Sequence, residues 1–271
     1  MDTKLLLAGC GKMGGALLAG WLDQGLRPSS ITVIEPSPDI GRSLTAGKGV
    51  AVVAAPGDLA DDYRPDIVVF AIKPQIMPDA VPAYARFAES GAVGLSIAAG
   101  KTIAFFESAL GKDTAVVRAM PNTPAAIRRG ITVACANPAA TPAQRDLCQS
   151  LLQAVGEVAW IDDENLMDAV TAVSGSGPAY VFLLAEYLAE AGAAAGLPAA
   201  LSDRLARATV SGAGELLNQT ADSAATLRTN VTSPGGTTAA ALDVLMADDG
   251  LGPLLTKAVA AAVKRSKELA D

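Results

Sequence analysis

Short runs of apolar residues alternate with longer segments of helical spacing up to about residue 160. The apolar runs are rich in Val and Ile and end at Gly, Pro, Asp or Ser, which is typical of buried strands. We predict strands over 5–8, 31–34, 50–54, 67–72, 92–97, 114–118, 131–134 and 157–161. Helices are expected over 13–24, 39–46, 75–88, 102–110 and 142–155. Such alternation predicts a mostly parallel, doubly wound sheet with helices on both faces.

The pattern changes after Asp162, where strand-like runs end and Ala, Leu and Gly recur at helical spacing. We predict helices over 165–173, 178–195, 198–217, 224–230, 237–246 and 252–269. Acidic residues at 162–164 favour a helix start, because carboxylates stabilise the positive end of a helix. The fold class is therefore α/β followed by all-α, with domains at 1–162 and 163–271. The Ala-rich second domain has little core of its own, so we expect it to dimerise.

Composition narrows the chemistry that the chain can perform. The chain has 271 residues, of which 51% are hydrophobic, and a formal net charge of −7. This balance predicts a packed globular protein and disfavours nucleic acid as a partner. The absence of histidine excludes imidazole bases, Ser-His-Asp and Cys-His systems, and most zinc sites, so no metal is expected. Three cysteines without a CxxC pair indicate reduced thiols in a cytoplasmic protein, and no apolar segment is long enough for a membrane span.

A glycine pattern directly follows the first predicted strand and opens a helix. It consists of Gly9, Cys10, Gly11, Lys12, Met13 and Gly14. The first glycine permits a tight turn, the second lets a pyrophosphate approach, and the third lets the helix pack on the strand. Glu35 ends the second strand about twenty residues later, where a carboxylate can accept hydrogen bonds from an adenosine ribose. The pattern predicts a dinucleotide site; the alternative is a turn that only needs glycines.

Further loops follow later strands at the same edge of the predicted sheet, where doubly wound folds bind their ligands. Together with Ser37 beside Glu35, they supply the remaining expected cofactor contacts, which are Ala71, Lys73, Pro74, Ala98, Ala99 and Asn122. A solvated lysine is the alternative interpretation of Lys73, and an ordinary turn between two prolines is that of Asn122.

Two motifs interrupt the helical half. Ser174 and Ser176 belong to a run that ends in Gly177-Pro178, which is either a simple kink or a cleft lined by serine hydroxyls. The second motif is Ser233, Pro234, Gly235, Gly236, Thr237 and Thr238, directly before a predicted helix. Its free amides and hydroxyls suit a small carboxylate without a cation, although a well-capped helix would show the same residues.

In chain order, the segments GCGKMG, AIKPQ, SIAAG, RAMPNTPA, TAVSGSGPAY and NVTSPGGTT resemble the pyrroline-5-carboxylate reductase family. The resemblance covers essentially the whole chain. It implies a Rossmann-type domain followed by a helical domain for substrate binding and dimerisation. It also implies that NAD(P)H reduces 1-pyrroline-5-carboxylate to L-proline, the last step of proline biosynthesis. The expected assembly is a homodimer or a larger homo-oligomer such as a decamer, with sites shared between chains.

Carried over from the family, Ser233, Gly236, Thr237 and Thr238 would hold the substrate carboxylate. We also expect substrate contacts from Gly235 in the same turn and from Ser174 and Ser176. Thr238 is the catalytic candidate, as a proton donor near the ring nitrogen. The sequence departs from the family at Lys12, where Asn is usual, and at Glu35, where a group for a 2′-phosphate is often found. The Glu35 carboxylate favours NADH; NADPH is the alternative, with Lys12 or Arg42 as the cation.

Two other functions compete with this one. A β-hydroxyacid dehydrogenase has the same layout, but members of that family are expected to carry a Lys-x-x-x-Asn pattern early in the helical domain. Here no lysine occurs between Lys112 and Lys257, which disfavours this alternative. A nucleotide sensor would bind NAD(P)H but leave 1-pyrroline-5-carboxylate unchanged.

Overall fold

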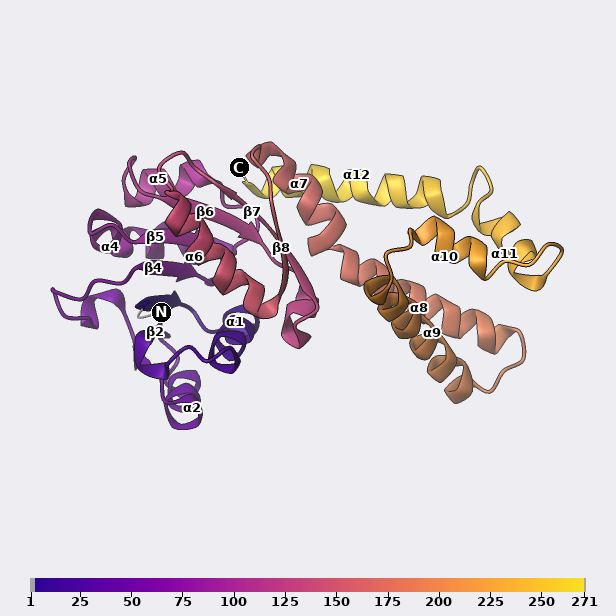
Figure 1. The fold of residues 1–271 in the computed structure, drawn as a ribbon, viewed down its shortest axis with the longest axis horizontal. Helices are drawn as coiled ribbons and strands as arrows, with labels where there is room; N and C mark the ends of the chain where they lie inside the picture. Colours follow the sequence, from indigo (N-terminus) through magenta and orange to yellow (C-terminus); the bar gives the residue numbers. More distant parts are fainter. Residues whose placement is uncertain (1–2, 271) are drawn as a thin grey trace. The chain divides into compact units, whose positions relative to one another are not determined.

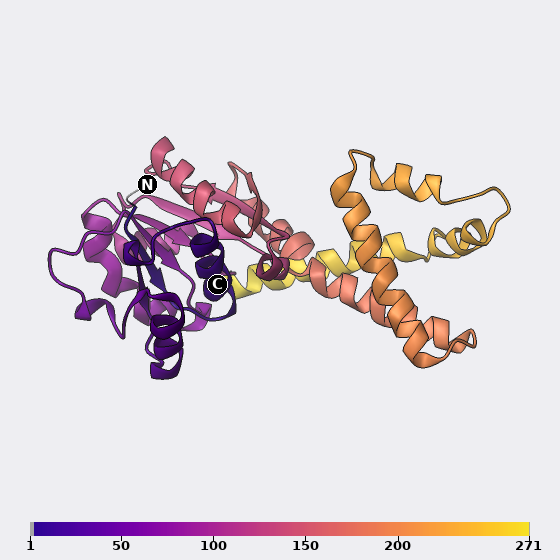
Figure 2. The ribbon, with the colours of Figure 1, turned by 60° about the horizontal axis from the view of Figure 1, so that its bottom comes forward.

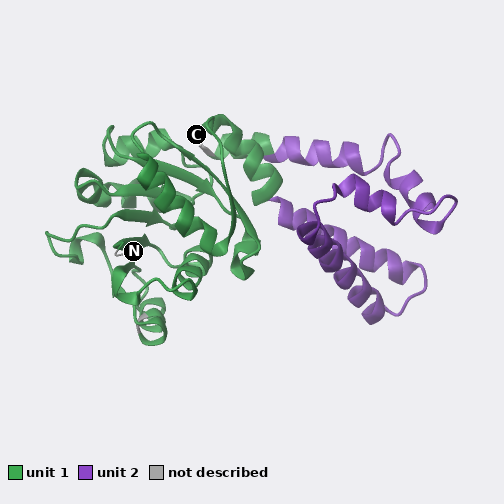
Figure 3. Cartoon of the chain, viewed as in Figure 1, with its two compact units in different colours: residues 1–175, 263–271 green, residues 176–262 purple. Residues whose placement is uncertain are grey.

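The structure, a computed structural model, describes residues 3–270 and divides into two compact units (Figure 3). The first unit contains the chain up to Gly175 and again from Val263 onward, and the second contains residues 176–262. This division differs from the boundary expected at 162. The reason is that Met167 is buried in a core of the first unit, and the end of the last helix belongs to that unit as well. Both segments are helical, so local sequence pattern did not separate them from the second domain.

The first unit is built on an eight-stranded sheet, which confirms the predicted α/β architecture. Its strands are β1 (Leu5–Ala8), β2 (Ile31–Ile34), β3 (Ala51–Val53), β4 (Ile67–Phe70), β5 (Val93–Ser96), β6 (Val116–Met120), β7 (Gly130–Ala136) and β8 (Gly156–Trp160). Their order is β3-β2-β1-β4-β5-β6-β7-β8. All neighbours are parallel except β6 and β7, because the connection between these two is too short for a crossover helix.

Helices cover both faces of this sheet, as Figures 1 and 2 show. The first face packs on α1 (Lys12–Asp23), α2 (Pro38–Lys48) and α6 (Pro142–Leu152). The second packs on α3 (Met77–Ala80), α4 (Ala85–Glu89), α5 (Ile103–Leu110) and α7 (Met167–Val170). Alternate residues of β1 enter the two cores, Leu5 and Leu7 on one side and Leu6 and Ala8 on the other. Strand β1 is therefore buried on both faces, and the chain emerges from it at the edge of the sheet.

The helix predicted over 75–88 is wrong as a single element. The structure has four short helical turns instead, at Pro74–Ile76, α3, Val81–Tyr84 and α4. Pro78 and Pro82 each stand in the first turn of their segments. Since proline has no N–H to continue a helix, each one ends the preceding turn and starts a new one.

The run at 174–178 does not form a loop either. The chain passes through a wide π-helical turn, Thr171–Gly175, into α8 (Gly177–Ala194), where Pro178 lies in the first turn. The Ser174 hydroxyl donates to the carbonyl of Val170 at 3.0 Å. A Cβ on Gly175 would meet the terminal methyl group of Met120, so any larger residue there would require this flexible side chain to move. The segment is therefore a kink in a nearly continuous helix, and the expectation that Ser174 and Ser176 line a substrate pocket stays a prediction.

The second unit contains α8, α9 (Ala199–Gln219), α10 (Ala224–Asn230), α11 (Thr237–Leu245) and most of α12 (Leu251–Ala270). Helices α8 and α9 pack as a hairpin, with the Ser202 hydroxyl donating to the carbonyl of Ala189 at 2.6 Å. Helices α10 to α12 make only sparse contacts with other elements. Within residues 176–262 only Ser202 and Ala206 are buried. In the described part of the chain, no helix is both long and apolar enough to cross a membrane.

Candidate functional site

The carboxyl ends of β1, β2, β4, β5 and β6 lie at one edge of the sheet, because these strands are parallel. The structure brings every predicted cofactor residue to the loops at this edge. These residues are Gly9 to Gly14 after β1, Glu35 and Ser37 after β2, Ala71, Lys73 and Pro74 after β4, Ala98 and Ala99 after β5, and Asn122 after β6. Doubly wound sheets bind their ligands at this edge, at the point where the strand order reverses, here between β1 and β4.

The glycine turn after β1 leaves room for phosphate. Gly9 has a φ of 86°, and its N–H donates to the carbonyl of Ile34 at 2.9 Å. A Cβ on Gly14 would lie 2.5 Å from the Gly9 carbonyl oxygen, whereas a Cβ on Gly11 would meet nothing within 4 Å. No side chain caps the start of α1 at Gly11. An open, uncapped helix N-terminus beside a close-packed turn fits a dinucleotide pyrophosphate.

Glu35 is held in place by both of its carboxylate oxygens. Oε2 accepts from the N–H of Cys10 at 3.0 Å, and Oε1 accepts from the N–H of Ser37 at 3.1 Å. The half-buried carboxylate thus connects the glycine turn to the β2–α2 loop. Arg42, one of the two candidate cations for a 2′-phosphate, pairs instead with Asp39. Lys12 is exposed on the first turn of α1.

The thiol of Cys10 is buried beneath this turn. Its pKa is raised to about 11, mainly by burial and further by the Glu35 carboxylate, with Lys48 acting in the opposite direction. The thiol therefore stays protonated at neutral pH and is no nucleophile. Cys10 serves the site through its backbone N–H, which binds Glu35.

The remaining loops at the edge are fixed by backbone contacts. The N–H of Ala71 donates to the carbonyl of Ala8 at 2.8 Å, and Lys73 beyond it is exposed. The Asn122 side-chain oxygen accepts from the N–H of Ile131 at 3.0 Å, which ties the β6 loop to β7. Sequence reasoning selected Asn122 as a cofactor contact; the structure gives its carbonyl group a role in fixing the loop.

The substrate candidates Ser233 to Thr238 lie in the second unit, at the start of α11. Gly235 has a φ of 68°, and the N–H of Gly236 donates to the carbonyl of Ser233 at 3.0 Å. No side chain caps α11, whose first two residues are Thr237 and Thr238. Its first amides therefore lack side-chain acceptors, as an anion site requires. Ser176 is the first residue of this unit, while Ser174 belongs to the first.

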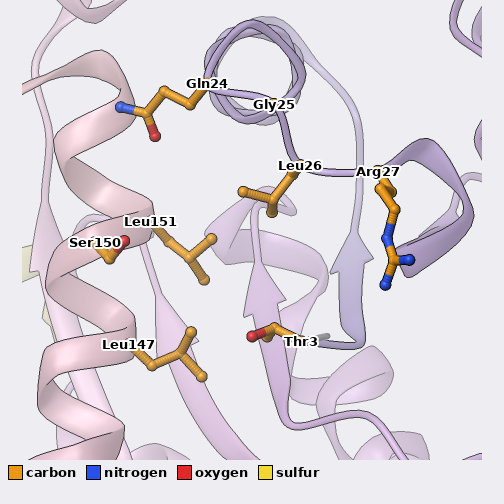
Figure 4. Close-up of a pocket in the computed structure, with 8 residues that line it drawn as sticks. All are labelled: Thr3, Gln24, Gly25, Leu26, Arg27, Leu147, Ser150 and Leu151. Carbon is orange, nitrogen blue, oxygen red and sulfur yellow. The ribbon is translucent and has the colours of Figure 1, made fainter. Parts of the chain in front are cut away.

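A hollow of about 520 Å³ lies elsewhere on the first unit (Figure 4). It lies at the amino-terminal side of the sheet, where Thr3 precedes β1 and Gly25 to Arg27 follow α1, with α6 forming its other wall. No predicted site residue lines it. The hollow is therefore separate from the candidate site.

Sequence reasoning missed three polar residues near the β5–α5 loop, Glu164, Asp168 and Ser266. They come from segments assigned to the helical domain, and each looks like an ordinary solvated helix residue. Glu164 and Asp168 lie in the first unit before the chain leaves it, whereas Ser266 belongs to the segment that returns at Val263, and no local sequence signal marks either placement.

An uncapped glycine turn at the switch point of a doubly wound sheet, followed by a helical unit, defines the chain as a dinucleotide-dependent oxidoreductase. A family model described as NADP oxidoreductase, coenzyme F420-dependent, matches residues 4–100 of the sheet unit. A second model, described as pyrroline-5-carboxylate reductase dimerisation, matches residues 164–269. The chain belongs to the pyrroline-5-carboxylate reductase family, which confirms the resemblance carried by its motifs.

Relatives match along the whole length. The pyrroline-5-carboxylate reductase of Pseudomonas aeruginosa is 38% identical over 268 residues, covering 99% of this chain and 97% of that protein. The structure of the Coxiella burnetii reductase is 36% identical, with a TM-score of 0.94 and full coverage of both chains. That of Plasmodium falciparum pyrroline carboxylate reductase with NADP bound is 29% identical, with a TM-score of 0.83, covering 99% of this chain and 98% of the other.

Proposed function

We propose that this protein reduces 1-pyrroline-5-carboxylate to L-proline with NAD(P)H, as the last step of proline biosynthesis. The observation that carries the proposal is the likeness to named reductases over both units, with 99% of the chain matched at 38% identity. The open glycine turn in the first unit and the uncapped α11 turn in the second provide two binding chemistries, one for phosphate and one for a small carboxylate.

In this proposal the substrate carboxylate binds at Ser233 to Thr238. Amides of the first turn of α11 and the hydroxyls of Ser233, Thr237 and Thr238 donate to it. No lysine or arginine occurs between residues 229 and 256. The substrate carboxylate is therefore held by neutral donors. No lysine of this segment stands beside the protonated ring nitrogen to repel its positive charge.

The protein's part in the reaction is mainly positioning. A protonated cyclic imine is already electrophilic, so the enzyme has to hold its C=N carbon in line and exclude competing orientations. When bound, NAD(P)H supplies the hydride. The Thr238 hydroxyl, two residues into α11, holds the proton at the ring nitrogen, directly or through a water molecule. This chemistry needs no histidine, and the chain has none.

The active unit is a homodimer formed through the dimerisation domain, and larger homo-oligomers such as a decamer would be built from it. The second unit supports this view because its large apolar side chains remain exposed in the single chain, among them Phe182, Leu184, Tyr187, Leu216, Val244 and Leu254. A second copy would bury them. The protein would work in the cytoplasm, consistent with its three free thiols.

The preferred cofactor is NADH. Glu35 at the end of β2 can accept from the ribose hydroxyls while its backbone N–H partners keep it in place, since a carboxylate accepts several hydrogen bonds. Arg42 is engaged by Asp39, which leaves Lys12 as the cation that would favour a 2′-phosphate.

The test is oxidation of NADH and of NADPH in the presence of 1-pyrroline-5-carboxylate, with a panel of 3-hydroxy acids and NAD(P)⁺ run in parallel. We expect turnover of the imine and none of the hydroxy acids. Activity only with a hydroxy acid would mean a dehydrogenase. Binding of NAD(P)H without turnover of either substrate would mean a sensor.

A further inference from the structure

The β5–α5 loop, residues 97–102, carries two of the predicted cofactor residues, Ala98 and Ala99. If Glu35 over β2 binds the adenosine ribose, the other half of the dinucleotide extends across the switch point toward β4, β5 and β6. The β5–α5 loop then borders the nicotinamide, where a small displacement affects hydride transfer most. Gly100 in this loop has a φ of 75°, a conformation that glycine adopts without strain.

One side of this loop is fixed by Glu164. Its Oε1 accepts from the N–H of Ile103, the first residue of α5, at 2.9 Å and from Nη1 of Arg118 at 2.6 Å. The Arg118 side chain is only 7% exposed. A buried charge that pairs with Glu164 keeps the carboxylate at the end of the loop, because separating the pair would leave the arginine unpaired in the interior.

The other side of the loop meets the end of α12. A Cβ on Gly100 would lie 3.1 Å from the carbonyl oxygen of Leu269, so the two backbones are in close contact. One turn earlier, the buried Ser266 hydroxyl donates to Oδ1 of Asp168 at 2.6 Å. Asp168 lies on α7, one turn after Glu164. Residues 164–168 therefore fix one end of the β5–α5 loop through Glu164 and also, through Asp168, hold α12, which contacts the middle of the loop.

We propose that the last turns of α12, residues 263–270, position the β5–α5 loop for the nicotinamide half of the cofactor, and that Ser266 is the positioning residue. The inference rests on the proposed function for the identity of the cofactor. It assigns a role to residues that lie about a hundred positions along the sequence from Glu164, which fixes the other side of the loop. Ser266 acts by holding α12 to Asp168, which keeps Leu269 against Gly100, and it does not touch the cofactor itself.

The test removes the hydroxyl with Ser266→Ala. We expect kcat to fall about three- to thirtyfold, because misplacing a catalytic contact costs rate more than affinity. The deuterium isotope effect from NAD(P)²H on kcat should rise as hydride transfer slows. The emission of bound NADH should change, while the affinity for ADP-ribose, which lacks the nicotinamide, should stay within about twofold.

The controls separate positioning from stability. Ser90→Ala makes the same chemical change at a hydroxyl just after α4, which donates to the carbonyl of Phe87. Ser266→Thr keeps the hydroxyl and should restore kcat. Deleting the chain from Leu269 onward removes the contact from the helix side while leaving Gly100, Ser266 and Asp168 intact, so it provides a second test if Ser266→Ala does not fold.

The proposal is overturned if Ser266→Ala and the variant that ends before Leu269 match Ser90→Ala in kcat, isotope effect and bound-NADH emission. It is also overturned if ADP-ribose affinity falls as much as kcat, since that would indicate general damage. Emission of bound NADH is measured without substrate. A wild type that leaves 1-pyrroline-5-carboxylate unchanged would refute the proposed function. The comparison of bound-NADH emission between Ser266→Ala and the wild type would still show whether Ser266 positions the loop.

Discussion

Replacing Glu35 with serine tests the proposed preference for NADH over NADPH. A 2′-phosphate carries about two negative charges at neutral pH. At about 6 Å from a carboxylate, with the effective dielectric of about 20 near a protein surface, each charge is repelled by about 3 kcal/mol. The N–H groups of Cys10 and Ser37 and dissolved salt reduce this repulsion. We therefore expect Glu35→Ser to shift kcat/KM toward NADPH by at least tenfold, about 1.4 kcal/mol.

The same substitution has a structural cost, because two backbone N–H groups lose their acceptor. Each unmet donor in a partly buried place costs about 1–3 kcal/mol, so the melting temperature should fall as well. Glu35→Gln removes the charge but keeps one acceptor oxygen, and should show the cofactor shift with a smaller loss of stability. Glu157→Ser, on the exposed surface of β8 at the far end of the sheet, makes the same charge change and should alter neither.

The assay is kcat/KM for both cofactors in the wild type and the three variants, with thermal unfolding measured in parallel. The reasoning fails if the wild type already prefers NADPH and the ratio is unchanged in Glu35→Ser. Glu35 would then serve only to connect the two loops.

Thr238→Val keeps the volume of the side chain but removes a hydrogen-bond donor to a charged group, worth about 1.5–3 kcal/mol. We expect kcat/KM to fall roughly 10- to 150-fold while the affinity for NADH is unchanged. Full activity of this variant would mean that the substrate carboxylate binds elsewhere. Gly11→Trp fills the open space beside α1 and should prevent cofactor binding. If each site is shared between two chains, mixing this variant with Thr238→Val should restore activity, because each heterodimer then contains one undamaged site. No rescue after proven subunit exchange would mean that each site lies within one chain. Burial raises the pKa of Cys10 and Cys135 to about 11 and that of Cys148 to about 12. The folded state therefore favours the neutral thiols, and the free energy of unfolding should fall as pH rises from about 8.5, the unfolded value, through 11. Denaturant titrations at pH 8 and 10.5 check this, and Cys148→Ala should reduce the difference.

The sheet was predictable because each strand is a compact apolar run, and a strand such as 67–70 is buried on both faces. The glycine turn was predictable because Gly9 and Gly14 lie too close to neighbouring atoms for a side chain, while Gly11 leaves open space in which a ligand can approach the backbone. The helix over 75–88 was not, since apolar spacing continues across Pro78 and Pro82 while the hydrogen bonds do not. The two hydrogen bonds to Glu35 and the hydrogen bond from Ser266 to Asp168 could not be predicted from the sequence, because they depend on which loops and turns meet in space.

The second unit is an insertion within the first, since the chain leaves the sheet unit after Gly175 and returns to it at Val263. During synthesis the sheet and its covering helices emerge early and can collapse on their own. The contacts of Ser266 with Asp168 and of Leu269 with Gly100 can form only after the whole helical unit has been made. The loop beside the cofactor is thus completed last, so a nascent chain can hold a folded sheet well before it has a finished nucleotide site.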